Sequence, residues 1–180
     1  ASMSVQFSRG CPFNCDFCNV TALLGHRVRT KTSAQIIAEL DSLYAHGWRE
    51  EVFFVDDNFI GNKNFLRTDL LPALIAWRKH KKGMPFYTEA SIDLAEDVPL
   101  MQTMVAAGFT RVFIGIETPD DACLAECKKV QNKNRDLLAD VKRIQQNGIE
   151  VQGGFIVGFD HDSPSIFRRQ IEGLSWSKPT

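Results

Sequence analysis

Three cysteines stand close together near the start of the chain. Cys11, Cys15 and Cys18 follow C-x-x-x-C-x-x-C spacing, directly after a short strand-like run. In a chain without a secretory signal, closely spaced thiols favour metal binding or redox chemistry over structural disulfides. Iron–sulfur clusters normally take four thiolates, but Cys123 and Cys127 lie more than one hundred residues away. The spacing therefore predicts a cluster with one iron open to an outside ligand, and an open position is typical of catalytic metal sites.

Two other uses of the cysteines remain open. A zinc site normally shows two Cys or His pairs at short spacing; no second pair adjoins the motif, although His26 is available as a fourth ligand. Cys123 and Cys127 are one helical turn apart and can share a helix face. They are too few for a second cluster on their own. The spacing favours one cluster over either alternative.

The cysteine motif resembles that of the radical S-adenosylmethionine (radical SAM) superfamily, including the aromatic Phe17 before the third cysteine. The resemblance implies that the three cysteines hold a [4Fe–4S] cluster. The amino and carboxylate groups of S-adenosylmethionine then chelate its fourth iron, and the reduced cluster cleaves that molecule to a 5′-deoxyadenosyl radical. Four segments also resemble the cobalamin-associated branch, which acts on tetrapyrroles and polycyclic isoprenoids. These segments are residues 8–12, 56–59, 115–119 and 154–160.

The composition is ordinary for a globular protein. The 180 residues suit one domain, with 44% hydrophobic and 24% charged residues. The net charge of −1 gives no indication of nucleic-acid binding. No apolar run approaches the roughly 20 residues of a membrane span, and no signal-peptide pattern precedes the thiols. Together these features predict a protein of the reducing cytoplasm.

The ends of the sequence suggest a piece of a longer polypeptide. The chain enters a strand almost at once, Ala1-Ser2 has the character of a cloning remnant, and the sequence stops directly after an apolar helix pattern. We expect residues 1–180 to form the radical SAM core. The resemblance implies a cobalamin-binding domain before this core and a further domain after it.

Hydrophobic patterns predict alternating strands and helices. The expected strands are residues 5–8, 51–55, 86–91, 111–116 and 151–157. The expected helices begin with a capping box at Thr32 and Gln35, continue around a break at Pro72, and end with one opened by Ser163-Pro164. Such a series predicts an α/β fold with a parallel sheet and right-handed crossovers. The resemblance implies a partial TIM-type barrel of six units, of which five are visible here.

Polar residues collect where the predicted strands end, which is the edge where α/β folds bind ligands. The resemblance places Asp57 and Asn58 near the methionine amino group, although Asp and Asn also favour turns and helix caps. It places Glu89, Ser91 and Glu117 near the methionine carboxylate or the ribose hydroxyls. A buried Glu needs a partner.

The last strand carries a glycine pattern that resembles the adenine-flanking segment of the family. Its residues are Gly154, Ile156 and Gly158. The family often has Glu three residues after the second glycine, but His161 stands there, preceded by Asp160. The last polar contact to the cofactor is therefore in doubt, and plain strand core is the alternative for these residues.

The resulting hypothesis is a radical SAM enzyme core that supports methylation or oxidative cyclisation of a tetrapyrrole or isoprenoid lipid. It implies a small-molecule or lipid-like substrate, cobalamin in the full-length protein, and a reductant such as flavodoxin or ferredoxin. One alternative is a tRNA methylthiotransferase-like enzyme. Another is a non-catalytic iron–sulfur electron-transfer module, which would need four protein ligands and no polar groups on the other strands.

Overall fold

A parallel sheet forms the centre of the molecule. The computed structural model describes residues 1–174. Its main sheet has five strands in the order β1-β4-β5-β6-β7, and every neighbouring pair is parallel. The strands are Met3–Val5 (β1), Val52–Phe54 (β4), Phe86–Ala90 (β5), Phe109–Glu117 (β6) and Glu150–Phe155 (β7). Strands therefore neighbour one another in chain order, as in part of a barrel, which confirms the predicted α/β fold.

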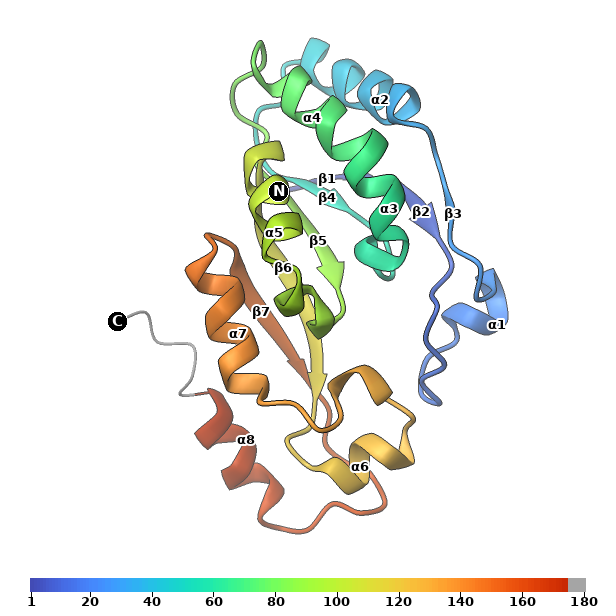
Figure 1. Ribbon diagram of the computed structural model, residues 1–180, viewed down its shortest axis with the longest axis vertical. Helices are drawn as coiled ribbons and strands as arrows, with labels where there is room; N and C mark the ends of the chain where they lie inside the picture. The colour runs from blue at the N-terminus through green and yellow to red at the C-terminus, as the bar shows by residue number, and fades with distance from the viewer. Residues whose placement is uncertain (175–180) are drawn as a thin grey trace.

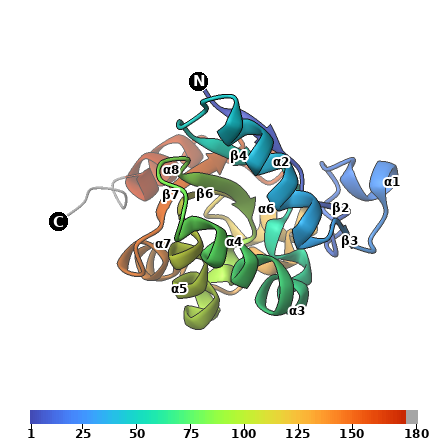
Figure 2. The ribbon, with the colours of Figure 1, turned by 90° about the horizontal axis from the view of Figure 1, so that it is seen from above.

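Helices cover one face of this sheet (Figures 1 and 2). The α-helices are Val20–Leu24 (α1), Ser33–Ala45 (α2), Lys63–Phe65 (α3), Leu71–Arg78 (α4), Val98–Ala107 (α5), Asp121–Glu126 (α6), Leu137–Gln146 (α7) and Ile166–Leu174 (α8). Short 3-10 turns are Phe59–Asn62 (η1), Ile92–Glu96 (η3) and Val130–Asn132 (η4), and a π-helical turn spans Leu66–Leu70 (η2). Within residues 1–174, none of the helices has the length and apolar character needed to cross a membrane.

The core lies between the sheet and helices α2, α4, α5 and α7, together with the turns η1, η2 and η3. Aromatic rings from three successive strands fill its centre: Phe54, Phe86 and Phe109 are almost fully buried, with pairwise centroid distances of 5.2 to 5.5 Å. Rings at these separations add about 0.5–1.5 kcal/mol per pair beyond the burial of their area. The opposite face is only half-buried, and there Phe53 stacks on Tyr87 at 4.4 Å. The continuous apolar run at residues 51–55 predicts a strand covered on both faces, and this prediction is wrong.

Two helix signals in the sequence are confirmed. At the start of α2, the Thr32 N–H donates to Gln35 Oε1 at 2.9 Å and Thr32 Oγ1 accepts from the Gln35 N–H at 3.3 Å, which is the expected capping box. Pro72 lies in the first turn of α4, directly after the π-helical turn η2. Because proline has no N–H to donate, the helix changes its hydrogen-bond pattern at this point.

Besides shifts of one or two residues at the ends of β4, β5 and β6, three predicted boundaries are wrong. Residues 5–8 are not one strand, because β1 ends at Val5 and the chain then forms β2 (Ser8–Arg9), antiparallel to β3 (Arg29–Thr30). The last strand ends at Phe155 rather than at residue 157: the Ile156 N–H still donates to the Glu117 carbonyl oxygen at 2.8 Å, but the Asp162 carboxylate then accepts the N–H groups of Gly158 and Phe159 and closes a turn. Helix α8 begins at Ile166, two residues after Pro164.

Candidate cofactor-binding site

The three cysteines lie on a loop between β2 and α1. Cys11, Cys15 and Cys18 are half-buried thiols. Gly10 has φ +99°, and a Cβ there would come within 2.7 Å of the Arg27 carbonyl oxygen, so only glycine lets the loop close against that segment. Glycine therefore starts the turn that carries the thiols away from the sheet.

The loop faces a cavity at the carboxyl ends of β4, β5 and β6. This cavity has about 190 Å³ open to water. Its lining includes the three thiols together with the five polar residues predicted from the strand ends: Asp57, Asn58, Glu89, Ser91 and Glu117. The structure thus brings the predicted groups together, and their roles in binding stay predictions.

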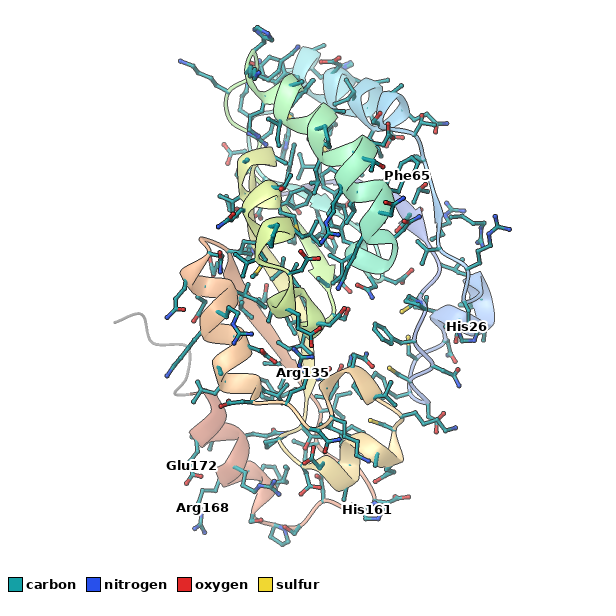
Figure 3. The ribbon with its side chains drawn as sticks, viewed as in Figure 1. His26, Phe65, Arg135, His161, Arg168 and Glu172 are labelled. Carbon is teal, nitrogen blue, oxygen red and sulfur yellow. The ribbon has the colours of Figure 1, made fainter. Side chains whose placement is uncertain are left out.

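The donor set fits a cluster better than a single zinc ion. Within residues 1–174, no three His, Cys, Asp or Glu side chains are arranged to hold one metal ion. His26 is exposed on the connection between α1 and β3 (Figure 3). In a [4Fe–4S] cluster each thiolate binds a different iron, so the sulfurs need not converge on one point. Three half-buried thiols beside an open cavity fit that group.

Glu89 and Asp57 give the cavity an acidic wall. Glu89 is half-buried, and its pKa is raised first by burial and then by the nearby charges of Asp57 and Asp56. Asp57 is exposed on the same cavity. A cationic group near both carboxylates would relieve this repulsion. The wall therefore suits a ligand that carries a sulfonium or an ammonium.

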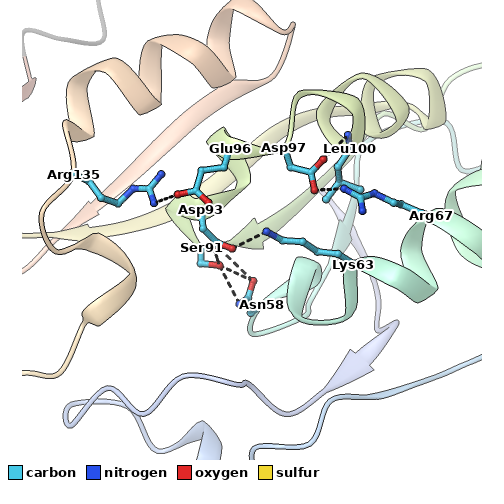
Figure 4. Close-up of polar contacts among 9 residues, drawn as sticks. All are labelled: Asn58, Lys63, Arg67, Ser91, Asp93, Glu96, Asp97, Leu100 and Arg135. Carbon is cyan, nitrogen blue, oxygen red and sulfur yellow. Dashed lines mark hydrogen bonds and ion pairs between the residues drawn. The ribbon is translucent and has the colours of Figure 1, made fainter.

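Asn58 and Ser91 are joined to each other (Figure 4). Asn58 Nδ2 donates to Ser91 Oγ at 3.2 Å, and the Ser91 N–H donates to Asn58 Oδ1 at 3.3 Å. Ser91 Oγ also donates to Asp93, which pairs with Lys63 at 2.8 Å. This network ties the ends of β4 and β5 together and holds both side chains in place at the cavity.

Asp56 does not line the cavity but connects two segments of the chain. Its carboxylate is 1% exposed and accepts hydrogen bonds from the N–H groups of Phe7 and Ser8 and from the Ser8 hydroxyl. Burial raises its pKa to about 6, against the lowering effect of these bonds. Asp56 thus joins the end of β4 to the segment that enters the cysteine loop.

Glu117 has the partner that its burial requires. Lys129 Nζ lies 2.7 Å from Glu117 Oε1, and both side chains are largely buried. Glu117 adopts φ +65° at an irregularity in the β6–β7 pairing, which turns its side chain over Gly115. A Cβ on Gly115 would come within 2.3 Å of the Glu117 carboxylate. Sequence reasoning missed Lys129.

The segment carrying Lys129 also touches the cysteine loop. The Asp16 N–H donates to the Cys127 carbonyl oxygen at 3.0 Å, and Lys128 Nζ pairs with the Asp16 carboxylate at 2.9 Å. Gln131 Nε2 lies 3.7 Å from Cys15 Sγ and lines the cavity. Sequence reasoning missed Gln131 too, because residues 127–132 show no regular hydrophobic period.

Cys123 and Cys127 are core thiols. They are 0% and 4% exposed. Cys123 Sγ donates to Asp162 at 3.4 Å, and burial raises the pKa of this thiol to about 12. Neither thiol lines the cavity. Their positions do not favour a second cluster.

The predicted adenine-flanking residues do not line the cavity. Gly154 lies on β7, Ile156 and Gly158 follow its end at Phe155, and none of the three is a lining residue of the cavity. A Cβ on Gly154 would come within 2.6 Å of the ring of Phe113, which does line it. His161 is exposed and pairs with Glu126 at 2.7 Å, so it does not supply the missing polar contact in this structure.

Comparison with known proteins identifies the family. Residues 5–169 match the model of the radical SAM superfamily. The chain belongs to this superfamily. Membership implies a [4Fe–4S] cluster and S-adenosylmethionine as cofactors and an enzymatic role.

Two relatives with high identity are named as a methyltransferase and a methylase. The chain is 52% identical to an uncharacterized methyltransferase of Synechocystis sp. over 88% of its length and 30% of that protein. It is 42% identical to the hopanoid C-2 methylase of Rhodopseudomonas palustris, over 89% and 31%. The chain thus spans about a third of these relatives.

Solved structures share the fold. The radical S-adenosylmethionine methyltransferase TsrM from Kitasatospora setae, with tryptophan and an analogue of S-adenosylmethionine bound, superimposes with a TM-score of 0.83 at 17% identity. The match covers 99% of this chain and 34% of TsrM. The cobalamin-dependent enzyme OxsB gives a TM-score of 0.76 at 19% identity, over 100% of this chain and 27% of OxsB.

Proposed function

We propose that this chain is the catalytic core of a longer, cobalamin-associated methyltransferase, with the [4Fe–4S] cluster held by Cys11, Cys15 and Cys18. The observation that supports this most directly is the cavity itself. Its lining combines three half-buried thiols with polar groups from three different strands. A closed electron-transfer cluster would use a fourth protein thiolate and would have no use for those polar groups.

In this proposal the cavity holds S-adenosylmethionine against the open iron. Asp57 and Asn58 accept hydrogen bonds from the N–H groups of its methionine amine, and Ser91, whose hydroxyl donates to Asp93, accepts a hydrogen bond from a ribose hydroxyl. Glu89 and Glu117 accept hydrogen bonds from the ribose hydroxyls. The acidic wall also faces the sulfonium, which is attracted by the Glu89 and Asp57 carboxylates.

The glycine segment supports the adenine side of the site. Gly154 allows the Phe113 ring to lie against β7, with 2.6 Å between the ring and the place of an added Cβ. We place adenine beside Phe113, with Gly154, Ile156 and Gly158 as the backbone behind it. This assignment gives the last strand a role through packing rather than through a polar contact.

Cys11, Cys15 and Cys18 would hold the [4Fe–4S] cluster, which in its reduced form would supply the electron for cleavage of S-adenosylmethionine to a 5′-deoxyadenosyl radical. The part of this chain is to hold the sulfonium against the iron and to keep water out of the cavity. The Phe13, Phe17 and Phe113 rings provide apolar lining for that purpose.

A polycyclic isoprenoid lipid is the substrate class we favour. The support is the 42% identity to the hopanoid C-2 methylase, against 26% to a bacteriochlorophyllide d methyltransferase of Chlorobaculum tepidum. Methylation is favoured over oxidative cyclisation, because the relatives are named as methyltransferases. A putative methylthiotransferase of Methanocaldococcus jannaschii is 23% identical and gives the RNA alternative weaker support. Cobalamin and a flavodoxin- or ferredoxin-type reductant complete the proposal.

Anaerobic reconstitution with iron and sulfide tests the proposal. The protein is then mixed with S-adenosylmethionine and titanium(III) citrate, and 5′-deoxyadenosine is measured by mass spectrometry. We expect a [4Fe–4S] absorption spectrum that changes on adding S-adenosylmethionine, followed by release of 5′-deoxyadenosine. Cys15→Ala should abolish both, whereas Cys127→Ala should preserve both. A reconstituted cluster that neither responds to S-adenosylmethionine nor cleaves it would contradict the proposal and favour an electron-transfer module.

A further inference from the structure

The side-chain amide of Gln131 lies between the cysteine loop and the cavity. Its Nε2 is 3.7 Å from Cys15 Sγ, within range of a hydrogen bond to sulfur. Its Oε1 is buried and has no hydrogen-bond partner within residues 1–174. The residue lines the same cavity as the three thiols. The Gln131 amide thus donates its N–H to the Cys15 sulfur, while its oxygen has no hydrogen-bond partner within residues 1–174.

The backbone around Gln131 is anchored on two sides. Asn132 Nδ2 donates to the carbonyl oxygens of Gly115 at 2.9 Å and Ile116 at 3.0 Å, which attaches the segment to the end of β6. On the other side the Asp16 N–H donates to the Cys127 carbonyl oxygen at 3.0 Å, which attaches it to the cysteine loop. The backbone that carries Gln131 is therefore held in place between the end of β6 and the cysteine loop.

The unsatisfied oxygen points to a missing donor. A buried acceptor without a partner costs about 1–3 kcal/mol, so such groups normally mark a bound water or a ligand. The nearby Lys129 ammonium pairs with Glu117. S-adenosylmethionine carries amine and hydroxyl hydrogens that can be donated to this oxygen.

The N–H group of the Gln131 amide would affect the reduction potential of the cluster. An N–H group that donates to a ligand thiolate stabilises the more negative, reduced cluster and so raises its reduction potential. A thiolate at Cys15 favours this amide orientation, because the reverse one would place the amide oxygen against a negatively charged sulfur.

We propose that Gln131 bridges the cluster and its ligand: its N–H donates to the Cys15 sulfur, and its oxygen accepts a hydrogen bond from S-adenosylmethionine. Gln131 is thus a positioning residue that couples occupancy of the cavity to the potential of the cluster. This inference rests on the proposed function and adds a residue to that same site.

Two substitutions in the reconstituted holoprotein separate the effect of the Gln131 N–H donor from that of the Gln131 oxygen acceptor. Gln131→Met has similar length but neither donor nor acceptor, and Gln131→Glu keeps an acceptor and loses the donor at neutral pH. Gln102→Met, on an exposed position of α5, is the matched control. The readouts are the midpoint potential without S-adenosylmethionine, from a redox titration followed by EPR, and the Kd of S-adenosylmethionine for the oxidised cluster, from calorimetry.

We expect Gln131→Met to change both the midpoint potential of the cluster and the Kd of S-adenosylmethionine. If the hydrogen bond favours the reduced cluster about tenfold, its loss lowers the potential by about 59 mV. The loss of one hydrogen bond to the ligand should weaken binding about tenfold, which corresponds to about 1.4 kcal/mol. Gln131→Glu should lower the potential as well but keep the Kd within about threefold of wild type, and Gln102→Met should change neither quantity.

An unchanged potential or an unchanged Kd in Gln131→Met would overturn the bridge. If that variant fails to fold, Gln131→Ala, which removes the whole amide, carries the same expectations. A wild-type protein that holds no cluster, or a cluster that does not bind S-adenosylmethionine, would instead refute the proposed function and the bridge with it.

Discussion

The five cysteines of this chain lie in two regions with different settings. On the loop between β2 and α1, Cys11, Cys15 and Cys18 are half-buried and line the cavity. On and directly after α6, Cys123 and Cys127 are 0% and 4% exposed and lie outside that lining.

The difference shows that the local backbone structure determines whether a thiol packs into the core or lines the cavity. Helix α6 is capped by the Asp120 carboxylate, which accepts from the N–H groups of Ala122 and Cys123, and its thiols point into the protein. The cysteine loop has little regular structure, so its thiols are free to face a ligand. The regions also touch, through the Asp16 N–H and the Cys127 carbonyl oxygen. The core thiols thus belong to the scaffold that supports the thiol loop.

Alkylation of the cluster-free protein should separate the two regions most strongly. The pKa of the Cys123 thiol is about 12 because of burial, so its thiolate fraction at pH 8 is roughly a thousandfold below that of an ordinary thiol. We expect iodoacetamide to modify the three loop cysteines long before Cys123, as measured by peptide mass spectrometry over time. Equal rates at all five positions would contradict the contrast.

Two neighbouring lysines test whether the scaffold depends on its buried ion pair. Lys129→Met leaves the Glu117 carboxylate, which is 7% exposed, without its partner. We expect a loss of about 3–5 kcal/mol in the free energy of unfolding, measured by urea denaturation. Lys128→Met removes only the exposed pair with Asp16 and should cost less than about 1 kcal/mol. Similar losses in both variants would show that burial of the pair does not matter.

A smaller, pH-dependent effect should come from Asp56, which holds the entry to the cysteine loop. Its folded-state pKa is about 6, above the ordinary value of 3.8, so the folded protein binds this proton more tightly than the unfolded chain. The stabilisation is present below about pH 4 and is lost as the pH rises to about 6, with a change of about 2–3 kcal/mol. Denaturation at several pH values should show this fall in wild type but not in Asp56→Asn. An identical pH dependence in the two proteins would assign the fall to other groups.

Much of the fold could be predicted because the strands are strongly patterned. Their order and the α2 capping box follow from hydrophobic runs and from the Thr32–Gln35 spacing. Alternation along β4 also contains a signal that sequence reasoning did not use. Asp56 shares the buried side with Val52 and Phe54, which separates it from the cavity-lining Asp57.

The rest of the site depends on contacts that sequence patterns do not carry. Lys129 and Gln131 reach the cavity after a left-handed residue, Lys128 at φ 55°, in a segment without a hydrophobic period. Their partners, Glu117 and Cys15, lie 12 and 116 residues away. The early end of β7 likewise depends on Asp162, whose role as an acceptor for the N–H groups of Gly158 and Phe159 is visible only in three dimensions.

The most direct test of the division between the two regions is the iron and sulfide content of five single alanine variants after anaerobic reconstitution. We predict that Cys11→Ala, Cys15→Ala and Cys18→Ala lose the [4Fe–4S] cluster, whereas Cys123→Ala and Cys127→Ala retain it at the wild-type level. Retention of the cluster in any of the first three variants, or its loss from a folded Cys123 or Cys127 variant, would contradict the assignment of the loop cysteines as its ligands.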